Sequence, residues 1–230
     1  MSSAWVRRFV TVAGVLLGAC GDGGTGPDGA ARVRFIHASP DAASLDVLVD
    51  GQPVVTGATY KSVSAYLAVG PGARHVRVRV AGTNDVLIDE MPELDGGTQY
   101  TLLATGGIDN MDPLLLTDDN TAPPSGAARV RLIHAAPNVG NIDIYVTPPG
   151  NNILTAAPAL TNIPFRSESG YVNVLAGTYQ VRITPSGTKV VAIDTGPVNL
   201  ASGMVRTAIA VEAPGGGGPF AALIVEDRNP

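Results

Sequence analysis

Residues 31–40 (ARVRFIHASP) and residues 128–137 (ARVRLIHAAP) are nearly the same ten-residue stretch, and they determine the expected fold. In the first stretch, Val33, Phe35 and His37 alternate with arginine and isoleucine side chains. Alternation with a period of two predicts a β-strand with one face in a core and the other in solvent. The proline that ends each stretch predicts a turn after the strand.

The likeness between the two halves continues beyond this first strand. The further matching segments are 45–49 with 142–146, 64–66 with 169–171, 75–78 with 180–183, and 114–120 with 223–229. The repeat distance of roughly 100 residues is that of whole domains rather than of solenoid units. The sequence therefore predicts two copies of one domain, residues 31–120 (copy one) and 128–230 (copy two), joined by a short linker at 121–127.

Each copy is expected to consist of short strands and tight turns. The 28 glycines and 18 prolines are turn formers, and dipeptides such as Asp50-Gly51 separate the strand-like segments. No ten-residue stretch carries the apolar stripe of an amphipathic helix. We therefore predict an all-β protein of two tandem antiparallel β-sandwich domains, with immunoglobulin-like or transthyretin-like strand order.

The N-terminal segment has the layout of an export signal. Two arginines precede the apolar run 9–17, which is too short for a membrane-spanning helix, and Cys20 follows as the single cysteine of the sequence. Residues 17–20 (LGAC) resemble the lipobox of bacterial lipoproteins. The resemblance implies that residues 1–19 are a lipoprotein signal peptide and that Cys20 carries acyl chains such as palmitate. An ordinary signal peptide with an unrelated cysteine is the alternative.

Residues 20–30 are rich in glycine and lack apolar periodicity, which predicts a flexible tether that spans roughly 15–20 Å. Gly21, rather than aspartate, follows the cysteine, and by analogy with bacterial lipoprotein sorting this favours the outer membrane. We expect an extracytoplasmic protein that its lipid anchors to a membrane, at the periplasmic face or at the cell surface. The formal net charge of -5 argues against nucleic acid as a partner.

His37 and His134 occupy the same position in the two copies, at the end of the first predicted strand. We predict a structural role, in which the ring nitrogens hold the following turn with the carboxylate of Asp46 or Asp143 as partner. The alternative roles are metal ligand and general base. A metal site needs two or three further His, Cys or carboxylate ligands, which the sequence does not offer nearby. The prediction is therefore no metal, no cofactor and no catalytic residue.

A hydrolase-type cluster is the rival interpretation of the same histidine. His37, Ser39 and Asp41 are the residue types of a base, a nucleophile and an orienting acid. In copy two, alanine and asparagine replace the serine and the aspartate, and the G-x-S-x-G motif is absent from the sequence. The comparison of the two copies therefore predicts that the protein is not an enzyme.

Two groups of charged residues have both a functional and a structural interpretation. The arginines expected on outward strand faces are Arg32, Arg34, Arg77, Arg79, Arg129, Arg131 and Arg182. We expect them to form cross-strand pairs with acidic residues rather than to bind an anionic glycan or lipid headgroup. The carboxylates of a candidate calcium site, which we interpret as solvated loop residues, are Asp109, Asp112, Asp118 and Asp119.

Recognition is expected in the loops of copy two, because loops on a rigid sandwich are where binding usually occurs. The candidate segments are 147–168, which is longer than its counterpart in copy one, and the glycine-rich 213–219. Tyr145 and Phe165 are the candidate anchor residues. The single tryptophan lies in the predicted signal peptide, which argues against a site that stacks sugars on tryptophan.

The whole pattern resembles one known family. Its elements are I-H-A-x-P after the first strand, D-[VI]-x-V, S-x-Y, and V-R-[VI], all present in both copies. These elements resemble the DUF4397 family, and the resemblance implies a sandwich fold and an extracytoplasmic setting without established catalytic residues. We therefore expect a non-catalytic binding or scaffold module for a protein or an envelope polymer. An envelope hydrolase and a purely structural envelope protein are the alternatives.

Overall fold

The computed structural model describes residues 29–229, and nearly all of the regular structure in this range is β-strand. The strands of copy one are β1 (Ala31–His37), β2 (Leu45–Val49), β3 (Gln52–Ala58), β4 (Leu67–Val69), β5 (Gly72–Ala73), β6 (Val76–Val80), β7 (Val86–Glu90), β8 (Glu93–Leu94), β9 (Gln99–Thr105) and β10 (Asp112–Asp118). Those of copy two are β11 (Ala127–His134), β12 (Ile142–Thr147), β13 (Leu160–Ile163), β14 (Val172–Leu175), β15 (Gly177–Pro185), β16 (Ile193–Leu200), β17 (Val205–Val211) and β18 (Ala221–Arg228). Two single 3-10 turns, η1 (Ile108–Asn110) and η2 (Pro137–Val139), lie between strands. The predicted signal peptide, Cys20 and most of the predicted tether lie outside the described residues.

Each half of the chain forms two four-stranded sheets that pack face to face. Hydrogen bonding gives the orders β10-β9-β1-β4 and β3-β2-β6-β7 in copy one. Copy two has the corresponding sheets β14-β11-β17-β18 and β13-β12-β15-β16, and a short β5-β8 pair is added in copy one. The prediction of an all-β protein with two tandem β-sandwiches is confirmed. In the described range, no helix is long and apolar enough to span a membrane.

One strand pair in each sandwich differs from a purely antiparallel arrangement. β1 runs parallel to β9, and β11 runs parallel to β17, while every other neighbouring strand pair in the described range is antiparallel. A parallel pair needs a long connection, and here the chain builds the second sheet of the sandwich before it returns to the first. The first strand of each copy therefore lies in the middle of its sheet.

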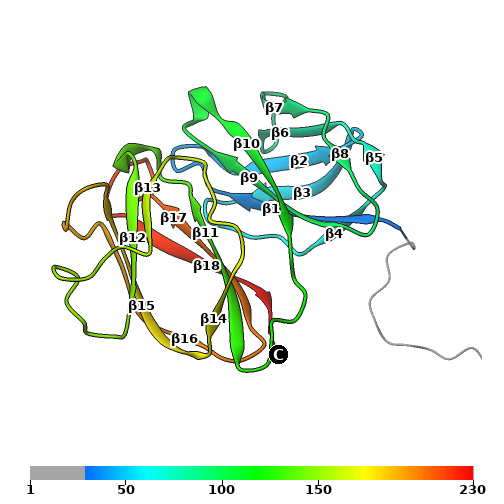
Figure 1. Ribbon diagram of the computed structural model, residues 1–230. Coiled ribbons are helices and arrows are strands. Elements are labelled where there is room, and N and C mark those ends of the chain that lie inside the picture. The colour runs from blue at the N-terminus through cyan, green and yellow to red at the C-terminus, as the bar shows by residue number, and fades with distance from the viewer. Residues whose placement is uncertain (1–28, 230) are drawn as a thin grey trace, which may run out of the picture.

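The two sandwiches pack against each other through one sheet of each (Figure 1). We call β10-β9-β1-β4 and β14-β11-β17-β18 the inner sheets, and the other two four-stranded sheets the outer sheets. Ile36 and Leu103 of copy one join Ile133 and Ile209 of copy two in one cluster, where each is at most 2% exposed. The inner sheets are therefore covered on both faces, and the four large sheets are stacked with separate apolar clusters between them.

The connection between the first two strands of the outer sheet differs between the copies. In copy one, Asp50 and Gly51 form the predicted tight turn from β2 to β3, with positive φ angles of 50° and 80°. Glycine and aspartate tolerate this left-handed backbone, which suits a two-residue hairpin. In copy two, residues 148–159 replace this turn.

Candidate functional site

His37 ends β1 and is fully buried, and both nitrogens of its ring have backbone partners. The N–H of Ser39 donates to Nδ1 at 3.3 Å. The proton of the neutral ring is therefore on Nε2, which donates to the carbonyl oxygen of Ala43 at 3.0 Å. The ring thus holds the turn that connects β1 to β2.

His134 makes the same two contacts in copy two. The N–H of Ala136 donates to Nδ1 at 3.3 Å, and Nε2 donates to the carbonyl oxygen of Gly140 at 2.8 Å. Burial lowers the pKa of both His37 and His134 below 6.5, although the carbonyl contacts oppose this in part. Both rings are therefore neutral at pH 7, and neither has a free nitrogen for a metal ion or a substrate proton.

The carboxylates expected as partners of the histidines lie elsewhere. Asp46 accepts hydrogen bonds from backbone N–H groups, the nearest that of Gly57 at 2.9 Å, and this contact lowers its pKa. Asp143 accepts from Asn162 N–H at 2.8 Å, and its hydrogen bonds outweigh burial and lower its pKa. The prediction that Asp46 or Asp143 orients a histidine is wrong, since both carboxylates hold loops of the outer sheets.

The residues of the hydrolase-type cluster do not form a nucleophile and base pair. The Ser39 hydroxyl points to Asp41, 3.4 Å away, whereas His37 receives the backbone N–H of Ser39. A serine is activated only when a base accepts its hydroxyl proton. Within residues 29–229, no group of three or more His, Cys, Asp or Glu side chains is placed to hold a metal ion.

Each buried histidine also meets an aromatic ring edge-on. The His37 and Tyr60 ring centroids are 5.9 Å apart at an interplanar angle of 72°, and those of His134 and Phe165 are 6.1 Å apart at 80°. Phe165 is therefore the counterpart of Tyr60. The sequence comparison does not match these two residues, because they differ in type and the preceding loops differ in length. Phe165 is half-buried against His134 and does not belong to the additional residues of copy two.

Tyr145 is also buried, at 2% exposure, and the Nζ atom of Lys189 lies 4.3 Å from the centroid of its ring. Lys189 donates to the carbonyl oxygens of Ile153 and Ala156, at 2.9 and 2.7 Å. The segment 148–159 is thus tied to the lysine that covers Tyr145. The structure corrects the expectation of an exposed anchor at Tyr145, because this ring supports the loop from beneath.

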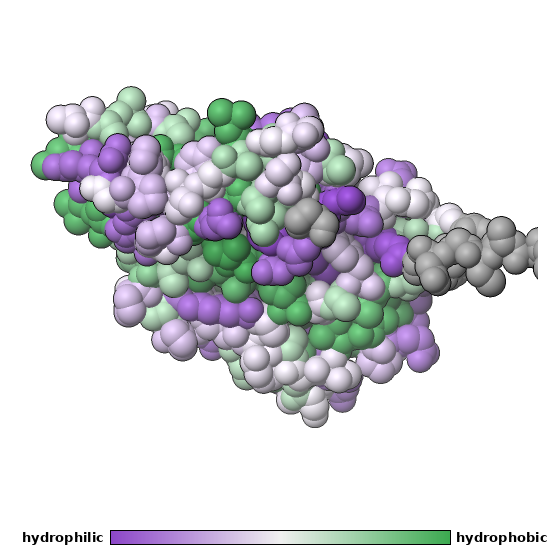
Figure 2. Space-filling model, turned by 90° about the horizontal axis from the view of Figure 1, so that it is seen from below, coloured by the Kyte–Doolittle hydropathy of each residue, from purple (hydrophilic) through white to green (hydrophobic). Residues whose placement is uncertain are grey.

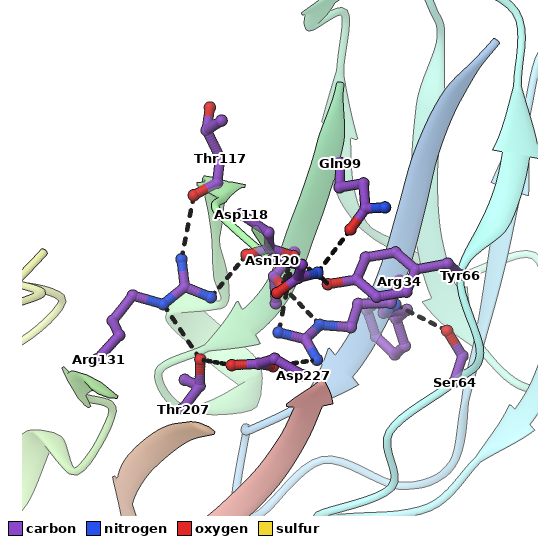
Figure 3. Close-up of polar contacts among 12 residues, drawn as sticks. Arg34, Ser64, Tyr66, Gln99, Thr117, Asp118, Asn120, Arg131, Thr207 and Asp227 are labelled. Atoms are coloured by element: carbon purple, nitrogen blue, oxygen red, sulfur yellow. Dashed lines mark hydrogen bonds and ion pairs between the residues drawn. The ribbon is translucent and has the colours of Figure 1, made fainter. Parts of the chain in front are cut away.

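Four charged side chains, Arg34, Asp118, Arg131 and Asp227, lie between the inner sheets, and we call them the central network (Figure 3). Nη1 of Arg34 lies 2.6 Å from Oδ1 of Asp227, and Nη2 of Arg131 lies 2.6 Å from Oδ1 of Asp118. All four side chains are at most 3% exposed. Each copy therefore neutralises the buried arginine of the other copy.

Two threonines complete the central network. Thr101 accepts a hydrogen bond from the arginine of copy one at 2.7 Å and donates one to Asp118 at 2.5 Å. Thr207 does the same in copy two, with distances of 3.2 and 2.6 Å. Such reciprocal contacts are typical of a two-fold symmetric dimer, and here they occur within one chain.

The sequence predictions for these charged residues are wrong in three places. Arg34 and Arg131 are not on solvent-facing surfaces, and Asp118 is not a solvated loop residue. The strand alternation correctly separates the faces of β1, but the second face is covered by the other copy. A signal was present in the sequence, since the arginine and the aspartate are identical at matched positions in both copies.

Comparisons with known proteins give little similarity at the level of whole structures. A CBM26-family module from Eubacterium rectale, crystallised in complex with maltoheptaose, is 9% identical with a TM-score of 0.26, and the match covers 87% of this chain and 97% of that one. A family 41 carbohydrate-binding module from a streptococcal virulence factor is 14% identical with a TM-score of 0.27, with coverages of 83% and 95%. Neither TM-score is high enough to assign a function. A search of curated proteins gives no match.

The comparison with family models gives a clear result. Residues 31–145 match the model described as "Domain of unknown function (DUF4397)". The matched range includes both strands that flank the His37 turn, and it extends through the His134 turn into β12. It covers half of the sequence, and the chain therefore belongs to the DUF4397 family.

Proposed function

We propose that this chain is a non-catalytic binding module of the bacterial cell envelope, held at a membrane by lipid on Cys20. In this proposal residues 1–19 are a cleaved signal peptide, and residues 20–30 form the tether. Residues 128–230 are a second copy of the family domain, separated from the first by the linker 121–127. The partner is a protein or an envelope polymer, and the favoured location is the outer membrane.

The observation that carries this proposal is the contrast between two regions: the buried polar residues of the protein interior and an exposed apolar surface on copy two. The histidines and the central network use their polar atoms in contacts within the chain. In copy two, by contrast, Leu154, Val190 and Val191 are 65%, 71% and 43% exposed, and we call them the apolar tip. Because Lys189 binds carbonyl groups on both sides of Leu154, the backbone at Leu154 and at Val190 lies close together. Exposed apolar side chains that are gathered in one place are typical of a protein-contact surface.

Polar contacts hold the apolar tip in place. Lys189 precedes Val190 in sequence and binds carbonyl groups on both sides of Leu154. The N–H of Gly150 donates to Oε1 of Gln180 at 2.8 Å, which fixes the start of the same loop to β15. A loop that is already ordered loses less conformational entropy on binding. These contacts support a preformed recognition surface.

The chemistry of the apolar tip favours a protein over a sugar polymer as the partner. Sugar sites commonly stack a ring on an exposed aromatic side chain, and the aromatic residue nearest to this loop, Tyr145, is buried under Lys189. The exposed groups of the tip are aliphatic. Aliphatic side chains are suited to fill a pocket on another protein.

Site-specific photo-crosslinking on intact cells tests the binding proposal. A photoreactive residue in place of Leu154 is expected to give one discrete adduct, whereas the same residue in place of Val86 of copy one, which is 44% exposed, is expected to give none. Replacement of residues 149–158 by an Asp-Gly turn is expected to abolish the adduct. Equal adducts at both sites would contradict the proposal, as would turnover of any substrate that His37→Ala abolishes.

Mass spectrometry of the membrane fraction tests the anchor. The N-terminal peptide of the mature protein is expected to begin at Cys20 with acyl chains attached. Cys20→Ser is expected to leave the protein unprocessed or to release it from the membrane, since one acyl chain or none gives only marginal binding. A processed N-terminus with a free thiol would show that the lipid is absent.

A further inference from the structure

An apolar cavity of about 200 Å³ lies between the inner and outer sheets of copy one. Phe35 and Leu102 of the inner sheet and Ile88 of the outer sheet form its buried wall. Val54 and Leu67, on the edge strands, are half-buried at its rim, so the cavity is open to solvent. Figure 2 shows hydrophobic surface on the side of copy one, close to the point where the grey trace meets the folded chain.

Copy two contains a cavity of about 110 Å³ in the corresponding place. By strand register, the wall residues Val33, Val49 and Val76 correspond to Val130, Val146 and Val181. Protein interiors are normally close-packed, and a random packing defect would not occur at equivalent positions in two sequences that have diverged. The open space between the sheets is therefore a property of the domain.

The two cavities differ in size and in the charged residues at their walls. Apolar atoms make up nearly all of the exposed wall in both copies, and Arg131 and Arg206 are the charged residues in copy two. In copy one the wall is aliphatic and aromatic, and Glu90 is its single charged residue. An engineered cavity of roughly 150 Å³ binds benzene, so by the same measure the cavity of copy one holds about eight carbon atoms.

We propose that the cavity of copy one binds a short hydrocarbon group of about eight carbon atoms, with a neutral or cationic head beside Glu90. The apolar wall excludes charged parts of a ligand, because a charge cannot be solvated there. The carboxylate at the rim repels an acidic head and attracts an amine. This site lies in a different sandwich from the apolar tip, so it does not depend on the function proposed above.

Titration of purified residues 21–230 with 1-octanol, octylamine and octanoate tests this site, with methyl NMR signals as the readout. The alcohol and the amine are expected to cause saturable shifts at Leu67, Leu102 and Leu115, which line the cavity. Octanoate is expected to bind about fivefold more weakly, the size of the repulsion between two like charges about 4 Å apart in water. Glu90→Gln is expected to remove this difference. Saturable shifts at Leu154 and Val190 in place of the cavity would overturn the proposal.

A matched pair of substitutions provides the control. Val33→Phe fills the cavity of copy one and is expected to weaken octanol binding at least about tenfold, whereas Val130→Phe, at the equivalent position of copy two, is expected to leave it unchanged. Far-UV circular dichroism checks that each variant is folded, and Leu115→Phe replaces Val33→Phe if the latter unfolds. Octanol binding that survives filling of the copy-one cavity would overturn the proposal, and so would the absence of saturable binding to the unsubstituted protein.

Discussion

Copy one and copy two keep the same charged residues in the central network between them, whereas their peripheral loops differ. The buried histidine, the arginine, the threonine and the aspartate of the central network are identical in both copies. The β2–β3 turn of two residues in copy one contrasts with the loop 148–159 of copy two. The cavity of copy one is about 200 Å³ with Glu90 at its wall, whereas that of copy two is about 110 Å³ with two arginines at its wall.

This difference shows which positions the shared interior constrains. Each arginine of the central network has its closest counterion in the other copy, so a change in one copy removes the shortest ion pair of a buried charge in the other. Loops and cavity rims have no such reciprocal partner and can change in one copy alone. The two copies therefore behave as a fused dimer with a symmetric centre and an asymmetric periphery.

Substitution of the two aspartates of the central network is expected to cause the largest loss of stability. Asp118→Asn leaves the arginine of copy two buried without its closest counterion, and its new NH2 group must face either this arginine or the two hydroxyl groups from which Asp118 accepts hydrogen bonds. The free energy of unfolding is expected to fall by about 3–5 kcal/mol. Asp227→Asn is expected to cost less, since burial raises the pKa of Asp227 and the charged form is less favoured there. Urea denaturation measures the free energy of unfolding of both variants, with Asp85→Asn at an exposed position as control. Equal losses for Asp118→Asn and Asp227→Asn would contradict the expected difference between the copies.

Substitution of the buried histidines is expected to cause the next largest loss of stability, and the loss should be equal in the two copies. His37→Ala and His134→Ala each strand a backbone N–H and a carbonyl group in a buried turn. The expected loss is about 1–3 kcal/mol for each variant. Thermal unfolding followed by circular dichroism provides the measurement. A loss confined to one copy would show that the two turns are not equivalent, and stoichiometric zinc or copper in the purified protein would contradict their structural role.

Stability is expected to depend on pH through the same two histidines. Their pKa values are lowered by burial in the folded state, so below about pH 6.5 the unfolded chain binds protons that the folded chain does not. The free energy of unfolding should therefore decrease as the pH falls from 7 towards 5. The double variant His37→Gln, His134→Gln should show a flatter profile in urea denaturation at several pH values. An unchanged slope in the double variant would assign the dependence to other groups.

The smallest expected change in stability concerns Tyr66 and Tyr171, the two tyrosines beside the central network. The Tyr66 hydroxyl donates to Asp118 at 2.6 Å, whereas the Tyr171 hydroxyl lies near Thr207 without a well-aligned hydrogen bond. Tyr66→Phe is expected to cost about 0.5–1.5 kcal/mol, and Tyr171→Phe close to nothing. Differential scanning calorimetry of the two variants makes the comparison. A larger cost for Tyr171→Phe would reverse the assigned asymmetry.

The strands and the repeat could be predicted because they are encoded locally. The alternation in residues 31–37 assigns Phe35 to one face and Arg34 to the other, and the tight turn at Asp50 and Gly51 follows from residue type. The sandwich fold follows from many such strands with turns between them. These features depend on neighbours along the chain, which a single sequence displays directly.

The surroundings of each face could not be predicted in the same way. Alternation shows that Arg34 and Ile36 share a face, but it does not show that a second sheet covers this face. For the same reason the sequence pattern predicts Asp118 in solvent, where the structure has it buried. Tyr145 carried no sequence signal of burial either, since it lies on an outward strand face that only the loop 148–159 and Lys189 cover.

The ion pair of Arg34 with Asp227 joins β1 and β18, the first and the last strand of the described range. Removal of β18 is therefore expected to take away the closest counterion of Arg34 and to destabilise copy one, although β18 itself belongs to copy two. Damage at one end of the folded chain thus reaches the opposite end through a single pair of charges.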